Sequence, residues 1–376
     1  MRLVVVSHAC AVPPNQVLYA ELERLTGWDM TLVLPRRWDT EFGPRAAERW
    51  PAFGGEIVPL PVIGSGSVPR HVYGRGLSET LKREIGGAMF VHHEPYGLAT
   101  MQAFAVLGRT ETTLGFYSSQ NLAKRYPAPV RWGERGVFAR ADYAVAATGA
   151  VVDVLRKKGY KGDANVLAML GVDTARFRPA PQREPRELVV GFVGRLTFEK
   201  GVDVLLDALA QVKDVPVSAI VTGDGPQRDA LHEQARRLGI SDRVSWAGYV
   251  PHERAEEAYA KVDVLAVPSR TTRGWAEQFG RVVLEALACE VPVVAAASGE
   301  LPSLLAATSG GWTFPEGDAR ALAARLSELV AQPEVLRAVG RAGRRVVDDR
   351  YSLARGAEAL ACTIERAVAR RARVAE

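Results

Sequence analysis

The chain has 376 residues, which is too long for one compact core and predicts two domains of similar size. Its apolar, charged and aromatic fractions are ordinary for a globular protein, and its formal net charge of +5 is mild. This charge suits an anionic substrate or an anionic membrane surface but does not require nucleic acid, and we expect no nucleic-acid partner.

The cysteines and the hydropathy pattern indicate in which compartment the protein is expected. Cys10, Cys289 and Cys362 lie far apart without metal-ligand spacing, and we expect reduced thiols in a cytoplasmic protein. The apolar run at the N-terminus is too short for a signal peptide, and no stretch is apolar for long enough to span a bilayer. Any membrane contact is therefore expected to be peripheral, at the inner face of the membrane.

The first half of the chain alternates between short apolar runs and helical patterns. Buried strands are expected at 3–6, 30–34, 55–62, 89–91, 113–116 and 143–147. Helices are expected at 17–25, 98–107 and 151–158. This alternation predicts an α/β domain with a mostly parallel, doubly wound sheet.

A proline-rich and charged segment at 177–186 predicts a linker, after which the alternation starts again. Strands are then expected at 188–193, 217–222, 244–246, 264–267 and 291–295. Helices are expected at 202–211, 227–238, 253–261 and 282–288. The predicted domains are therefore 1–178 and 187–355, followed by a C-terminal helix at 356–376 that could pack back across the domain seam.

A basic turn follows the strand expected at 188–193. Gly194 lets the backbone approach a ligand, and the next helix start presents unpaired N–H groups. Arg195 can hold phosphate oxygens bidentately, while Lys200 adds a mobile positive charge. The turn favours a diphosphate site, although a solvated basic loop explains the same residues equally well.

Two glutamates flank the start of the helix expected at 282–288. Glu277 lies in the preceding loop, and Gly280 stands just ahead of the helix, whose N–H groups could cap a phosphate. Glu285 lies inside an apolar stretch, where a buried carboxylate needs hydrogen bonds that ribose hydroxyls would supply. An exposed helix position is the alternative for Glu285.

Together these motifs resemble the retaining GT-B glycosyltransferases of family four, the group 1 glycosyltransferases. The matching segments are Gly194-Arg195 with Lys200-Gly201, Gly223-Asp224-Gly225-Pro226, Gly248-Tyr249-Val250, Pro268-Ser269 and the run from Glu277 to Glu285. Each segment is a weak signal, but their order and spacing are specific. The resemblance implies two Rossmann-like doubly wound domains facing across a cleft, with the acceptor-binding domain first and the nucleotide-sugar donor-binding domain second.

The resemblance also implies a role for each matching residue. Arg195 and Lys200 would stabilise the departing diphosphate, and Glu277 would contact hydroxyls of the transferred sugar. Glu285 would bind the ribose, and the backbone near Val250 would meet the base. The other donor-binding positions are Gly194 and the backbone amides of Phe279, Gly280, Arg281 and Val282.

The reaction implied by the resemblance is transfer of a hexosyl unit from a UDP- or GDP-sugar to a hydroxyl of a saccharide or glycolipid acceptor. Retention of configuration follows from the resemblance alone, and no cofactor or metal is expected. The chain contains no Asp-x-Asp pair, which suits metal independence. A small-molecule acceptor is the alternative, followed by a sugar-nucleotide epimerase.

Two further classes are less favoured. A nicotinamide-dependent oxidoreductase would share the doubly wound fold, but the glycine fingerprint expected after the first strand is missing. A catalytically silent sugar-binding protein would be expected to have lost the charged residues that remain at Arg195, Lys200, Glu277 and Glu285.

The first half matches the family less closely. Relatives often carry paired glycines after the first strand, which the segment at 7–15 lacks. Tyr117 stands where many relatives have an active-site histidine, and a tyrosine of ordinary pKa cannot transfer protons at neutral pH. Tyr117 and Asn121, from the same segment, are therefore acceptor-side candidates with no assigned proton chemistry.

The segment at 91–96 resembles the strand end that lines the acceptor side. His93 and Glu94 are candidates for acceptor binding or proton transfer, with local pairing as the alternative for Glu94. His92 is expected in the core. His8 lies at a strand end on the same side, and an acceptor role for His8 is as well supported as a purely structural role. His8 and His93 are not expected to be metal ligands, because no third ligand has a recognisable spacing.

The segment at 124–135 mixes cations with aromatic residues in the acceptor-side domain. It could contact anionic lipid headgroups around a lipid-linked acceptor. A solvated loop and helix face is the favoured alternative.

Overall fold

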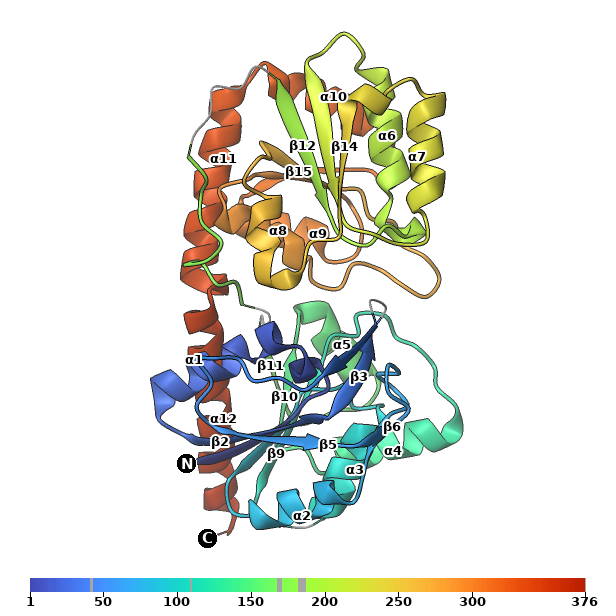
Figure 1. Ribbon diagram of the computed structural model, residues 1–376. Coiled ribbons are helices and arrows are strands. Elements are labelled where there is room, and N and C mark those ends of the chain that lie inside the picture. Colours follow the sequence, from blue (N-terminus) through green and yellow to red (C-terminus); the bar gives the residue numbers. More distant parts are fainter. Residues whose placement is uncertain (41–42, 109, 168–170, 182–186, 376) are drawn as a thin grey trace. The chain divides into compact units, whose positions relative to one another are not determined.

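The computed structural model describes residues 1–40, 43–108, 110–167, 171–181 and 187–375 and divides into two compact units (Figure 1). Unit 1 comprises Met1–Gly171 and Leu353–Glu376, and unit 2 comprises Val172–Ser352. Among the described residues, no helix combines the length and the apolar character needed to cross a membrane.

Unit 1 is built on a parallel sheet with the strand order β11-β10-β9-β8-β1-β2-β5. Its strands are β1 (Arg2–Val6), β2 (Asp29–Pro35), β5 (Glu56–Leu60), β8 (Ala88–Val91), β9 (Thr113–Ser118), β10 (Tyr143–Ala146) and β11 (Asp163–Val166). Two short antiparallel pairs are β3 (Arg37–Thr40) with β4 (Gly43–Ala46) and β6 (Val62–Ile63) with β7 (Val72–Tyr73).

Helices cover both faces of this sheet. They are α1 (Val17–Thr26), α2 (Gly76–Arg83), α3 (Leu98–Leu107), α4 (Ala128–Phe138), α5 (Gly149–Lys157) and α12 (Leu353–Ala375), with short turns η1 (Ala9–Ala11) and η2 (Pro13–Gln16). Successive residues of a strand point to opposite faces. Accordingly Leu3 and Val5 of β1 pack in the cluster that holds α1 and α12, whereas Val4 and Val6 pack with α2, α3 and α5.

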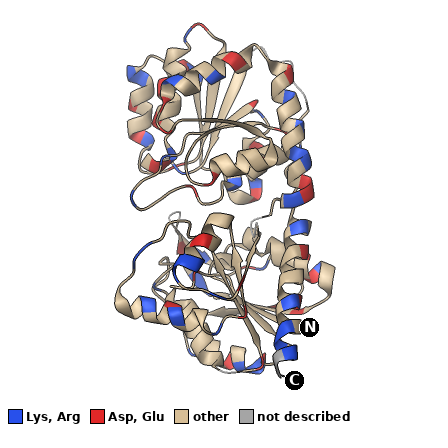
Figure 2. Cartoon of the chain, turned by 180° about the vertical axis from the view of Figure 1, so that it is seen from behind, with Lys and Arg blue, Asp and Glu red and all other residues tan. Residues whose placement is uncertain are grey.

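The C-terminal helix α12 belongs to unit 1. Its buried Leu360 and Ile364 share a cluster with residues of α1. Figure 2 shows basic residues along this helix, and two of them reach acidic partners in unit 1. Arg371 lies 2.7 Å from Asp142, and Arg370 lies 2.8 Å from Asp163, so charge adds to the apolar contact with the first unit.

Unit 2 repeats the plan with the strand order β14-β13-β12-β15-β16-β17. Its strands are β12 (Leu188–Val193), β13 (Val217–Thr222), β14 (Val244–Gly248), β15 (Val264–Val267), β16 (Val293–Ala296) and β17 (Gly311–Phe314). Its helices are α6 (Val202–Gln211), α7 (Arg228–Arg237), α8 (Arg281–Ala288), α9 (Leu301–Thr308), α10 (Ala319–Val330) and α11 (Pro333–Val346). The helical turns are η3 (Phe198–Lys200), η4 (Ser241–Arg243), η5 (His252–Ala258) and η6 (Val347–Tyr351). The α/β class with two doubly wound parallel sheets is therefore confirmed.

The division between the units differs from the expected ranges 1–178 and 187–355. Val172 already belongs to unit 2, where its N–H donates to the carbonyl of Tyr351. Phe177 is buried in the same unit, with its ring 6.0 Å from that of Tyr259. The start of the predicted linker is thus part of the second core, and its residues 182–186 lie outside the described residues.

Several elements differ from the sequence-based expectation. The edge strands β11 and β17 were not predicted, because most of their residues are only half-buried and no continuous apolar run marks them. The helix expected at 253–261 is a set of tight turns over His252–Ala258, which Arg254 interrupts with non-helical backbone angles. The long apolar strands of both sheets were predicted because they are buried on both faces.

Candidate active site

The candidate donor site lies at the carboxyl ends of β12 and β15 in unit 2. These strands are neighbours in the sheet, but the chain visits β13 and β14 between them, so the strand order reverses here. Ligands of open α/β sheets bind at such a switch point. Lys200 follows β12, Ser269 follows β15, and Glu277 precedes α8.

The site brings Lys200 and Glu277 into direct contact. Lys200 Nζ lies 2.8 Å from Glu277 Oε2, and Ser269 Oγ donates to the same oxygen over 3.1 Å. Lys200 Nζ also lies 4.8 Å from the centre of the Trp275 ring. Glu277 is 9% exposed, so its carboxylate is partly withdrawn from water and compensated by this cation. Two of the predicted catalytic residues, Lys200 and Glu277, therefore form an ion pair.

Backbone geometry holds the two loops close together. Gly201 has φ +67°, and a Cβ at this position would collide with the carbonyl oxygen of Pro268, next to Ser269. Gly280 has φ +72° and caps α8, whose first N–H groups, those of Arg281 and Val282, have no partner within the helix. Both positions require the left-handed backbone region that glycine adopts without strain.

The other predicted residues of these loops differ in how far they are buried. Gly194 directly follows β12, and its N–H donates to the carbonyl of Thr222 over 3.0 Å. The Arg195 side chain is 47% exposed and lies 3.9 Å from Glu199, which leaves its guanidinium in reach of solvent. Phe279 is half-buried and packs against the core beneath α8.

Glu285 is buried, and protein side chains surround its carboxylate. Tyr259 donates to Oε2 over 2.8 Å, Arg281 Nε lies 2.9 Å from Oε1, and His252 Nε2 lies 3.5 Å from Oε1. The exposed alternative is therefore wrong. The carboxylate also does not depend on ribose hydroxyls for compensation, because these three side chains already supply it.

The charge state of Glu285 follows from these contacts. Burial raises its pKa, but the hydrogen bond with His252 and the charge of Arg281 outweigh burial and hold the pKa below its ordinary value of 4.5. Val250, the expected contact for the base, is half-buried and lies two residues before His252. The sequence did not single out Tyr259 or His252, because neither belongs to a spaced motif.

In unit 1, Glu94 is held by local partners. Ser118 Oγ donates to Oε2 over 2.6 Å, and the backbone and side chain of Ser119 donate to Oε1 over 2.7 and 3.0 Å. Burial raises the pKa of Glu94 despite these bonds. The local-pairing alternative for Glu94 agrees with this geometry.

Tyr117 and His92 pack against each other at the end of the first sheet. Their ring centres are 4.8 Å apart, and His92 Nδ1 shares a 2.8 Å hydrogen bond with the hydroxyl of Tyr19. Burial lowers the pKa of His92 to about 4 and raises that of Tyr117, so both are neutral at physiological pH. Asn121 lies half-buried in the loop that follows Tyr117.

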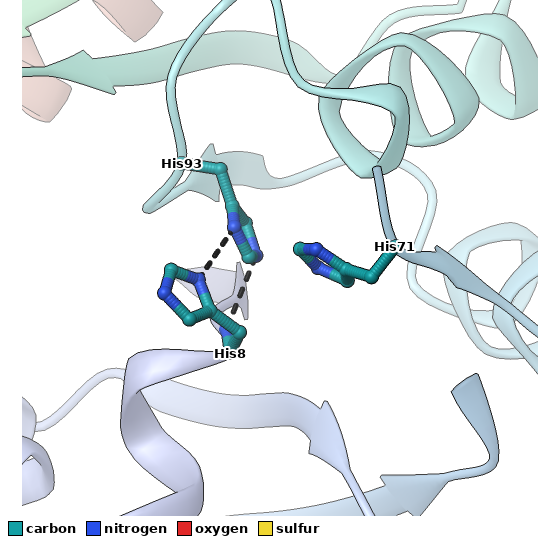
Figure 3. Close-up of side chains that lie close together, drawn as sticks. All are labelled: His8, His71 and His93. Atoms are coloured by element: carbon teal, nitrogen blue, oxygen red, sulfur yellow. Dashed lines mark hydrogen bonds between the residues drawn. The ribbon is translucent and has the colours of Figure 1, made fainter. Parts of the chain in front are cut away.

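His8 and His93 meet at the same sheet end, together with a residue that was not predicted, His71 (Figure 3). The Nδ1 atoms of His8 and His93 are 2.8 Å apart, and the backbone N–H of His8 donates to His93 Nε2 over 3.1 Å. The ring centre of His71 lies 4.9 Å from that of His93 and 5.5 Å from that of His8. The chain brings His71 in from the β6–β7 hairpin, so sequence spacing could not reveal it.

The donor-site residues fall within a recognised sequence family. Residues 173–346 match the family described as Glycosyl transferases group 1. Residues 173–346 are called the group 1 region below. The group 1 region contains Arg195, Lys200, Glu277 and Glu285, whereas the three clustered histidines lie outside it.

Curated relatives with named activities match part of the chain. A D-inositol 3-phosphate glycosyltransferase from Segniliparus rotundus is 34% identical over 256 residues, which are 63% of this chain and 56% of the relative. A GDP-mannose-dependent alpha-(1-6)-phosphatidylinositol monomannoside mannosyltransferase from Mycolicibacterium smegmatis is 35% identical over 195 residues, which are 48% of this chain and 51% of the relative. The chain spans about half the length of the curated relatives it matches.

Solved structures resemble the whole chain, including the part outside the group 1 region. Sucrose-phosphate synthase from Thermosynechococcus elongatus has a TM-score of 0.75 at 20% identity and covers 98% of this chain and 99% of its own. Anabaena Alr3699/HepE in complex with UDP has a TM-score of 0.74 at 17% identity, with 97% and 100% covered. These likenesses show the fold, and the predicted GT-B architecture of two Rossmann-like domains is confirmed.

Proposed function

We propose that this chain is a retaining, metal-independent hexosyltransferase that uses a nucleotide sugar as donor. It would move a hexosyl unit from a UDP- or GDP-sugar to a hydroxyl of a saccharide or glycolipid acceptor. The observation that carries the proposal is the ion pair of Lys200 with Glu277 at the switch point of the group 1 region, beside the unpaired N–H groups of α8.

The arrangement suits the departure of a nucleoside diphosphate. Negative charge develops on the leaving group, and fixed cations together with aligned amides lower the barrier to its formation. Lys200 and Arg195 would supply the cations, and the N-terminus of α8 would supply the amides. Glu277 would hold Lys200 in place and accept hydrogen bonds from the sugar hydroxyls, while Glu285 would face the ribose.

The substrates are proposed from the relatives. One is named a D-inositol 3-phosphate glycosyltransferase, one is GDP-mannose-dependent, and one solved neighbour was crystallised with UDP-glucose. These names support a UDP- or GDP-sugar as donor and a hydroxyl-bearing saccharide or glycolipid as acceptor. Retention of configuration is proposed from the family resemblance.

A panel of nucleotide sugars tests the proposal. We expect one UDP- or GDP-sugar to give nucleoside-diphosphate release that rises when the right saccharide or glycolipid is added. Donor hydrolysis without acceptor should be unchanged by a chelator, because Lys200 and Arg195 stand where a divalent ion would neutralise the diphosphate. Proton NMR of the product would report the anomeric configuration. If no nucleotide sugar turns over or protects the protein from unfolding, the proposal fails.

We also propose a cytoplasmic protein with peripheral membrane contact through α4 and the loop before it. Trp132 is 67% exposed, and Lys124, Arg125, Arg131 and Arg135 are exposed around it in sequence. Exposed aromatics and cations are attracted to anionic bilayers, by roughly 1 kcal/mol per cation near the surface.

Co-sedimentation with vesicles checks this contact. The chain should sediment with vesicles rich in anionic lipid and should stay in the supernatant with neutral vesicles or high salt. Trp132→Ala combined with Arg131→Gln should reduce binding several-fold, while Trp312→Ala in unit 2 serves as a control for loss of a tryptophan. Equal sedimentation of the wild-type chain with anionic and neutral vesicles would contradict the proposal.

A further inference from the structure

The histidine cluster of unit 1 lies where its sheet can bind a ligand. His8 follows β1 and His93 follows β8, and the sheet order β8-β1-β2 reverses at these two strands. His71 directly precedes β7. One ring nitrogen from each of the three residues lies within 4.8 Å of the other two, and Figure 3 shows the rings converging from three separate segments.

The hydrogen bonds of His71 orient one bare nitrogen toward its neighbours. Its Nδ1 lies 2.9 Å from the carbonyl oxygen of Val68 and 3.2 Å from that of Ser67, so the proton resides on Nδ1. Nε2 therefore carries the lone pair, and it is buried without a hydrogen-bond partner. Histidines that ligate metals commonly donate their other N–H to a backbone carbonyl in this way.

Aromatic side chains enclose the cluster. The Trp38 ring centre lies 4.9 Å from the ring centres of both His8 and His71, and that of Tyr73 lies 5.6 Å from that of His71. The Tyr73 hydroxyl is a second buried polar atom without a hydrogen-bond partner. Two such atoms on adjoining side chains are costly to bury, and a polar ligand or ion at the cluster would relieve that cost.

The donor set indicates the chemistry of the ligand. The three residues offer imidazole nitrogens, and the side chains of His71 and His93 are buried. Hard cations such as Mg²⁺ and Ca²⁺ require oxygen ligands, whereas imidazole suits zinc, copper and nickel. The nearest candidate carboxylate in sequence, Glu94, is occupied by Ser118 and Ser119.

We propose that His8, His71 and His93 bind one divalent transition-metal ion, with a fourth coordination position left for water or a bound ligand. Three imidazoles and one open position are a known arrangement for zinc, at Zn–N distances of about 2.0 to 2.1 Å. The backbone N–H of His8 donates to Nε2 of His93, so neutral His93 carries its proton on Nδ1 and donates it to Nδ1 of His8. A shared ion would replace both hydrogen bonds, because it needs the lone pairs of His8 Nδ1 and His93 Nε2. Small rotations of the rings would bring the three nitrogens to the ion.

The proposed metal ligands and the proposed donor residues come from different parts of the chain. The three ligands belong to unit 1 and lie outside the group 1 region, whereas Lys200 and Glu277 belong to unit 2. A metal bound here is therefore compatible with a donor site that needs none. The two proposals can fail independently, because metal binding is measured without turnover.

The test uses the full chain, stripped of metal with a chelator, dialysed and titrated with Zn²⁺ against a chromogenic chelator. We expect about one equivalent of Zn²⁺ per chain. His71→Gln should weaken binding at least about 10- to 100-fold. His232→Gln, which removes a unit 2 imidazole stacked on Trp246, and His92→Gln, which removes the neighbour bonded to Tyr19, should bind as the wild type does.

Substitution of Co²⁺ provides a readout that needs no variant. The cobalt form should show visible bands typical of four-coordinate Co²⁺ and shifted proton resonances from three imidazole rings. Circular dichroism without metal checks that His71→Gln folds. The proposal is overturned if the wild-type chain binds no stoichiometric Zn²⁺ or Co²⁺, if fewer than three imidazoles shift, or if folded His71→Gln binds with wild-type affinity.

Discussion

Replacing Lys200 by alanine is expected to slow nucleoside-diphosphate release by about 100- to 1,000-fold, the usual cost of removing one group that stabilises charge in the transition state. Lys200 is the cation that pairs with Glu277 at the switch point of unit 2, and Ser269 donates to the same carboxylate oxygen. Its loss should act on kcat more than on KM, because the charge it meets develops as the diphosphate leaves. Steady-state kinetics with the best donor of the panel measures this.

Arg195→Ala is expected to act in the same direction, since its exposed guanidinium lies on the same loop. Lys213→Ala is the matched control, because Lys213 is an exposed lysine of unit 2 that follows α6. Control turnover should equal that of the wild type. Unchanged turnover in both Lys200→Ala and Arg195→Ala would refute the assignment of the donor site.

A double-mutant cycle separates the role of Lys200 from that of its partner. Lys200→Ala leaves the buried Glu277 carboxylate without its cation, so part of the loss comes from a disturbed Glu277. Residues in contact show non-additive effects. We therefore expect Lys200→Ala combined with Glu277→Gln to be less impaired than the product of the two single effects. Multiplicative effects would mean that the ion pair is absent in the catalytic state.

Much of the fold could be predicted because strands that are buried on both faces consist of continuous apolar runs. The runs at 188–193 and 264–267 coincide with β12 and β15. The hairpin of β6 and β7 could not be predicted in this way, since its two-residue strands carry too little pattern. The start of the apparent linker was misplaced because Phe177, one apolar residue among prolines and charges, is anchored in the second core.

The donor site could be predicted only as far as its motifs extend. Lys200 and Glu277 belong to two of the motifs whose order and spacing resemble the family. The fold brings these two residues together from 77 positions apart. Tyr259 and His252 compensate Glu285 from turns that carry no spaced motif. His71 likewise joins His8 and His93 only in three dimensions. Contacts between separate segments determine these environments, and periodicity along the chain does not report them.

Replacing Glu285 by glutamine is expected to lower the free energy of unfolding of unit 2 by about 3 kcal/mol, the low end of the cost of breaking a buried ion pair. The substitution keeps the shape of the side chain but leaves Arg281 without its anion and weakens the bond from Tyr259. Urea denaturation at neutral pH, followed by tryptophan fluorescence, measures the change. Glu253→Gln, at an exposed glutamate of the nearby turn η5, should leave the free energy of unfolding unchanged.

The pH dependence of this loss identifies its cause. The pKa of folded Glu285 lies below its ordinary value of 4.5, so the stabilisation is fully present above about pH 4.5 and is lost as the pH falls through the folded pKa. Protonated Glu285 is neutral, as glutamine is. The difference in free energy of unfolding between wild type and Glu285→Gln should therefore be constant at neutral pH and shrink on acidification. A difference that stays the same from neutral to acidic pH would show that shape and packing, rather than the charge compensated by Arg281 and His252, make Glu285 necessary.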